Sequence, residues 1–136
     1  MKTIAISLLS LLIAITTINC KKDDGGTTNT TDTPGSITIT IPTTSNVFIN
    51  GTPLRVEGEM TDMNGLATAK VEIKNKATGA VLYQQSNPTT NVSFFRFMFS
   101  WTVSGITAPT PATVKVTAID KLSNQVFKEV DVTLVN

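Results

Sequence analysis

The chain is poor in the residues that most often carry chemistry. It has no histidine and a single cysteine, Cys20, in 136 residues. Without histidine it lacks the side chain that most often serves as a general base or a metal ligand. One cysteine cannot close an internal disulfide, and there is no C-x-x-C pair for zinc or redox chemistry. The composition therefore indicates a protein that is not an enzyme.

The chain also lacks a large excess of either basic or acidic side chains. The chain has 11 basic and 10 acidic side chains, a formal net charge of +1. Binding to nucleic acid depends on neutralising phosphates with excess Lys and Arg, so we expect no nucleic-acid partner. Hydrophobic residues make up 40% of the chain, which is typical of a globular protein and, at this length, of one domain.

The longest apolar run stands at the N-terminus, in residues 3–18, behind Met1 and Lys2. It falls short of the roughly 20 apolar residues that a membrane-spanning helix needs. Its length and basic start are typical of a secretory signal peptide. A buried core helix is disfavoured because apolar side chains cover every face of the segment.

Cys20 closes this run and is followed by "KKDDGG". The arrangement resembles a bacterial lipoprotein signal, and "CKKDD" (residues 20–24) resembles the lipoproteins that Bacteroidetes display on the outer face of the outer membrane. The resemblance implies a cleaved signal peptide (1–19) and a lipidated Cys20 thiol. It also implies that the lipid anchors the protein in the cell outer membrane, with the protein facing the cell exterior. The alternative is an unmodified, buried cysteine in a secreted protein.

Residues 20–35 comprise Cys20, the predicted lipidation site, and a Thr-, Gly- and Asp-rich segment. Residues 21–35 hold no apolar side chain larger than a Thr methyl or a Pro ring. Such a segment cannot bury enough surface to offset the entropy of ordering it. We therefore expect a flexible tether between the anchor and a domain formed by residues 36–136.

That domain shows a repeating strand pattern. Ile37, Ile39 and Ile41 alternate with Thr, the period of a half-buried strand. Asn50-Gly51 predicts a hairpin turn between two strands, and Thr78-Gly79 predicts a second turn that leads into a further strand, "AVLYQQ" (residues 80–85). Alternating apolar residues indicate strands around residues 54–60, 70–74, 93–103, 112–119 and 126–135, with Asp62 and Asn64 in a loop. No segment has a helical period.

One face of the 93–103 segment is expected to supply the largest part of the core. That face carries Phe95, Phe97, Phe99, Trp101 and Val103. About seven strands in some 100 residues is the pattern of an all-β, immunoglobulin-like sandwich. "LRVEGEMTDMNGLATAKVEIKN" and "ATVKVTAIDKLSNQ" also resemble bacterial Ig-like and cadherin-like modules, which implies this fold and no particular activity.

Four oxygen-bearing side chains lie in two loops that such a sandwich would bring to one end. They are Asp62, Asn64, Asp120 and Asn124. Together they could hold Ca²⁺, which takes about six to eight oxygen ligands. We favour the alternative that each Asp and Asn forms a local Asx-turn. No other cofactor is expected.

Two further groups have both a functional and a structural interpretation. Glu57 and Glu59 project from one strand face about 7 Å apart, within the range of glycosidase carboxylates. Alternating charge on a solvated strand explains them as well. Tyr83 and Trp101 are suited to stack on a sugar ring, but Trp101 shares a face with three phenylalanines and is expected in the core.

The leading hypothesis is a surface-anchored lipoprotein whose Ig-like domain binds a protein or glycan, or serves a structural role, without catalysis. One alternative is an accessory glycan-binding lipoprotein of a polysaccharide-uptake system, with Tyr83 in the site. Another is a self-assembling surface or pilus subunit, in which the strand at residues 37–41 or the strand at 126–135 pairs with a second chain.

Overall fold

The computed structural model describes residues 35–136 of the chain. These residues form six strands and no helix, so none of the described residues belongs to a helix able to cross a membrane. The strands are β1 (Ser36–Ile41), β2 (Val47–Ile49), β3 (Pro53–Asn75), β4 (Val81–Thr102), β5 (Thr110–Asp120) and β6 (Gln125–Val135). The signal peptide, Cys20 and the tether predicted from the sequence lie outside the described residues.

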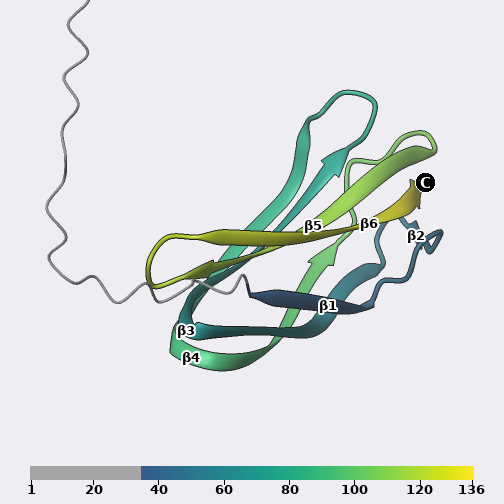
Figure 1. Ribbon diagram of the computed structural model, residues 1–136. Coiled ribbons are helices and arrows are strands. Elements are labelled where there is room, and N and C mark those ends of the chain that lie inside the picture. The colour runs from purple at the N-terminus through teal and green to yellow at the C-terminus, as the bar shows by residue number, and fades with distance from the viewer. Residues whose placement is uncertain (1–34) are drawn as a thin grey trace, which may run out of the picture. The chain divides into compact units, whose positions relative to one another are not determined.

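The six strands form one sheet that curls until its two halves face each other (Figure 1). The order along the sheet is β1-β3-β5-β6-β2, and β4 pairs with β3. Every pair is antiparallel except β2 with β6, which is parallel. The first layer holds β1 with residues 53–61 of β3 and 94–102 of β4. The second layer holds β2, β5, β6 and the remaining halves of β3 and β4.

Bulges bend β3 and β4 where the two strands pass from one layer to the other. Residues 62–65 of β3 lie opposite the single residue Ser93 of β4. Extra residues on one strand of a pair increase the local bend and twist. The φ angles of Gly65 and Asn91 are 94° and 61°, in the left-handed region that Gly and Asn tolerate best. The two strands therefore bend together and stay paired in both layers.

This bend corrects one prediction from the sequence. Asp62 and Asn64 were expected in a loop between two strands, but both belong to the continuous strand β3. β4 likewise joins two segments that the pattern predicted as separate strands. The sandwich therefore has six strands rather than about seven, and two of them serve both layers.

The turn at Asn50-Gly51 forms, with a φ of 86° at Gly51, but it does not connect a hairpin. β2 pairs with β6, whereas β3 pairs with β1, β4 and β5. The backbone amide of Asn50 donates a hydrogen bond to the Val135 carbonyl, and the backbone amide of Gly51 donates to the Val103 carbonyl, both at 2.7 Å. An Asn-Gly pair fixes the geometry of a turn but not the neighbour of each strand, so the predicted hairpin is wrong.

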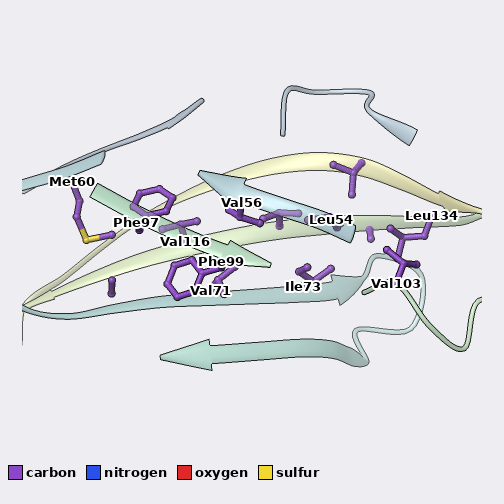
Figure 2. Packing of buried hydrophobic residues seen from close by; sticks show 14 of the residues in the cluster. Leu54, Val56, Met60, Val71, Ile73, Phe97, Phe99, Val103, Val116 and Leu134 are labelled. Atoms are coloured by element: carbon purple, nitrogen blue, oxygen red, sulfur yellow. The ribbon is translucent and has the colours of Figure 1, made fainter. Parts of the chain in front are cut away.

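A single hydrophobic core lies between the layers (Figure 2). The predicted inward positions are confirmed at Phe97, Phe99 and Val103, which are buried. Phe95 and Trp101 are half-buried and pack against the margin of this core. The core also includes Leu54, Val56, Met60, Leu66, Ala69, Val71, Ile73, Ile106, Ala112, Val114, Val116, Ala118, Val132 and Leu134.

Candidate functional site

Three of the four predicted calcium ligands meet around one hollow of about 190 Å³ at an end of the sandwich. Asp62 lies in the β3 bulge, Asp120 is the last residue of β5, and Asn124 lies in the turn before β6. Gly35 lines the same hollow, whereas Asn64 is not among the lining residues. Asp62 and Asp120 are both buried, with exposed fractions of 8% and 4%.

Backbone amides already use the oxygens of these carboxylates. Asp62 Oδ1 accepts a hydrogen bond from the Asn64 amide at 2.7 Å. Asp120 Oδ1 accepts from the amides of Leu122 and Asn124 at 2.8 and 2.7 Å. Asp120 Oδ2 accepts from the Asn124 side-chain amide at 2.9 Å. These are the Asx-turn contacts that the alternative interpretation expected.

The hydrogen bonds also set the ionisation of Asp120. Burial acts most strongly on its pKa and raises it, but the hydrogen bonds from Asn124 and Leu122, helped by Lys121, together lower the pKa below 3.8. The carboxylate is therefore the form that the turn stabilises.

The geometry fits a calcium ion poorly. A calcium ion at this site would compete with three hydrogen bonds for the Asp120 oxygens. Within residues 35–136 no three His, Cys, Asp or Glu side chains gather where they could hold a metal ion. Two carboxylates supply a small share of the ligands that Ca²⁺ needs. Calcium binding stays a prediction, and the structural role of these residues is favoured.

A second candidate site lies on the flank of the sandwich, where Tyr83 and Trp101 stack. Their ring centroids are 5.8 Å apart and the planes differ by 15°. Tyr83 pairs with Ile73 in the second layer and Trp101 pairs with Leu54 in the first, so the stack joins the two layers. Both rings are half-buried and pack against the core.

A row of polar side chains continues from Tyr83 along β4. The Tyr83 hydroxyl hydrogen-bonds to Gln85 Oε1 and lies 3.3 Å from the Ser100 carbonyl oxygen. Gln85 Nε2 donates to Asn87 Oδ1 at 3.1 Å. Tyr83, Gln85 and Asn87 stand two residues apart, so their side chains share one face of the strand. The spacing was readable in the sequence, but nothing there placed Trp101 against Tyr83.

The third candidate surface is the outer face of the first layer. Glu57 and Glu59 lie there, beside Arg96 and Met98, around an open hollow of about 440 Å³. Glu57 is the cross-strand neighbour of Met98, and Glu59 is the neighbour of Arg96. Met98 is 67% exposed, and Phe94 at the same edge is 46% exposed. Exposed apolar groups beside charges are typical of a binding surface rather than of an enclosed catalytic site.

Among the described residues, charged side chains form ion pairs on the second layer but not on this outer face of the first layer. In the second layer Lys76 pairs with Asp131 at 2.7 Å and Lys74 pairs with Glu72 at 2.7 Å. On the first layer, Arg55, Glu57, Glu59 and Arg96 form no ion pair with any described residue. Arg96 instead lies 5.8 Å from the centre of the Phe94 ring. The first layer thus presents charges that are available to a partner.

A scan against protein-family models finds no match for this chain, and a search of curated proteins finds none either. Solved structures do match it. The fibronectin(III)-like modules of CbhA from Clostridium thermocellum have a TM-score of 0.51 and 16% identity, covering 73% of this chain and 94% of that one. Murine CRIg has a TM-score of 0.44 and 9% identity, with coverages of 76% and 98%.

A third match is the CARDB domain of the PF1109 protein from Pyrococcus furiosus, solved in complex with di-metal ions. Its TM-score is 0.41 and its identity 16%, with coverages of 74% and 85%. At these identities the likeness concerns the fold alone. Together with the two-layer architecture, the match to the fibronectin(III)-like modules confirms the predicted Ig-like β-sandwich. Residues 35–136 thus have an Ig-like fold.

Proposed function

We propose that this chain is an outer-membrane lipoprotein, anchored through Cys20 and facing the cell exterior, whose Ig-like domain is a non-catalytic binding or structural module. Exposed Phe94 and Met98 beside unpaired charges on the first layer carry the binding part of the proposal. The apolar N-terminal run that ends at Cys20, and the "KKDDGG" that follows it, support the anchor.

The anchor is tested in cells that express the full chain. A clickable palmitate analogue should label the wild type and not Cys20→Ala, and the variant should leave the membrane fraction. Two or more acyl chains hold a protein firmly, so removing them all has a large effect. A wild-type chain that keeps Met1 and a free Cys20 thiol would contradict lipidation. Protease added to intact cells should remove the domain if it faces outward.

The binding role is tested with a photo-crosslinking residue placed at Met98 of the anchored chain. We expect Met98 to give a defined adduct on the cell surface. The matched control carries the crosslinker at Lys115, on the outer face of the second layer next to Glu129. A structural module without a partner would give no adduct at either position, and equal labelling at both would contradict a specific surface on the first layer.

A second candidate function is glycan binding at the Tyr83 flank. The stacked aromatic pair and the amides of Gln85 and Asn87 favour it, because sugars bind to aromatic faces with amide groups alongside. Affinity electrophoresis in polysaccharide gels is the test. Tyr83→Ala would also disturb packing against Trp101, so Gln85→Ala is the informative variant, with the exposed residue Gln84→Ala as its control.

A further inference from the structure

The second half of β4 has a free edge. Among the described residues β4 pairs only with β3, so no strand pairs with its other side. The Tyr83 hydroxyl does lie 3.3 Å from the Ser100 carbonyl oxygen. Residues 94–102 pair with residues 53–61 of β3 without a register shift. This segment contains no proline and no lysine. A regular edge with exposed apolar side chains and a single charge, Arg96, is prone to pair with another strand.

The other edges carry features that oppose strand addition. β1 has a register shift between Ile39 and Ile41, and Pro42 follows it. The first half of β4 contains Pro88, and its pairing with β3 is irregular. β6 is covered by β2 at residues 133–135. The remainder of β6 bears three charges, Lys128, Glu129 and Asp131. The two strands that the sequence suggested for self-assembly are therefore less suitable than residues 94–102.

We propose that two copies of this chain pair antiparallel along residues 94–100 of β4, around a twofold axis at Phe97. The inference rests on the proposed role as a binding or structural module and names the partner as a second copy. Each copy offers the same edge, so the contact is self-complementary and closes as a dimer. The pairing would also satisfy backbone groups of both edges with hydrogen bonds.

Charge selects this register among the neighbouring ones. With the axis at Phe97, the second copy's Arg96 lies beside Met98, and Glu57 is the next residue across the sheet. An axis at Arg96 would place the two Arg96 side chains opposite each other. An axis at Met98 would set the second copy's Arg96 beside Ser100, whose next neighbour is Arg55. Like charges at these distances are unfavourable, so the Phe97 axis is preferred.

The proposed register also gives the exposed groups partners. Strands lie about 4.8 Å apart, so the Cα atoms of Glu57 and the second copy's Arg96 would be about 10 Å apart. Extended Arg and Glu side chains can span that separation. The stem of the second copy's Arg96 would cover Met98, since long charged side chains pack their methylene groups on apolar surface. Met98 and Arg96 would thus lose their present exposure together.

The test is sedimentation velocity on the detergent-solubilised full chain over a range of concentrations. Wild type is expected to be a dimer. Arg96→Glu should weaken association by roughly tenfold or more, because it places like charges near Glu57. Arg96→Glu with Glu57→Arg should restore the dimer. Lys115→Glu, on the other layer, is the matched control and should leave association unchanged.

A disulfide variant reports the register independently of charge. Residues 94 and 100 face each other across the proposed axis and are far apart within one chain. Phe94→Cys with Ser100→Cys should form a crosslinked dimer under mild oxidation, whereas Ser100→Cys alone should not. A monomeric wild type, a dimer that Arg96→Glu leaves intact, or oligomers that grow without limit would each overturn the inference. A monomer that still gives the Met98 adduct would overturn it while leaving the binding module in place.

Discussion

Gly58 gives the sharpest test of the packing between β1 and the core. It stands at an inward position of β3, opposite Phe97 on one side and Ile39 on the other. A Cβ at residue 58 would lie 2.1 Å from the Thr38 carbonyl oxygen and 2.6 Å from Phe97 Cζ. The absence of a side chain at residue 58 thus lets the Phe97 ring and the β1 backbone approach β3 together.

We expect Gly58→Ala to destabilise the domain by about 1–3 kcal/mol, the range for overpacking a core. The β1 backbone would have to retreat by roughly 1 Å to restore a normal contact. Replacing Gly by Ala also restricts the unfolded chain, which offsets about 0.4–1 kcal/mol of that loss. For a domain of this size each kcal/mol corresponds to a change in Tm of about 4–8 °C.

Urea denaturation measures the loss, and hydrogen exchange of the β1 amides locates it. Since the nearest obstacle is a backbone carbonyl, adding Phe97→Leu to Gly58→Ala should recover little stability. Ser100→Ala, an exposed position on β4, is the control and should change stability by less than about 0.5 kcal/mol. A Gly58→Ala variant as stable as wild type, with β1 amides equally protected, would refute the close approach of β1.

Three further predictions concern single groups. The Thr89 hydroxyl is buried without a hydrogen-bond partner in the described part of the chain. Thr89→Val should therefore raise the free energy of unfolding, measured by urea denaturation, by about 1 kcal/mol. An unchanged midpoint of the urea transition would indicate that a bound water satisfies the hydroxyl. The pKa of Asp120 is lower in the folded chain than its unfolded value of 3.8, so the ionised carboxylate stabilises the fold at pH values above 3.8. This contribution is lost as the pH falls through the folded pKa. The stability difference between wild type and Asp120→Asn should therefore shrink from about pH 6 to about pH 3. Millimolar CaCl₂ should leave Tm unchanged, whereas a rise that Asp62→Asn abolishes would establish a calcium site.

Much of the core could be predicted from the alternation of apolar and polar residues along the sequence. Phe97, Phe99 and Val103 are buried as the alternation predicted, because a strand with one apolar face can pack only one way. The same alternation could not reveal that β3 and β4 continue through the bend. Asp62, Asn64 and Gly65 are turn-forming residues in either case, and whether a turn becomes a loop or a bulge depends on the paired strand.

The candidate sites were less predictable because they depend on contacts across the layers. Asp62 and Asp120 could be placed at one end from the order of the strands alone. The stack of Tyr83 on Trp101 could not, since it joins two residues of β4 that lie in different layers. Arg96 and Met98 alternate in the sequence with the apolar row of the 93–103 segment, but only the position of β4 at a free edge makes them a candidate contact.

The continuous hairpin of β3 and β4 places both candidate binding surfaces on one strand. Tyr83, Gln85 and Asn87 lie on the first half of β4, and the proposed dimer edge lies on the second half. The bulge between the halves fixes the orientation of each relative to the other, because both remain paired with β3. In a sandwich whose layers are joined only by loops, two such surfaces could move independently. Here a second copy bound along residues 94–100 would lie beside the Tyr83 flank, since Tyr83 stacks on Trp101 next to that edge. The proposed self-association and the proposed glycan binding would therefore compete for one flank, so a dimer of the proposed register should bind glycan more weakly than the monomer.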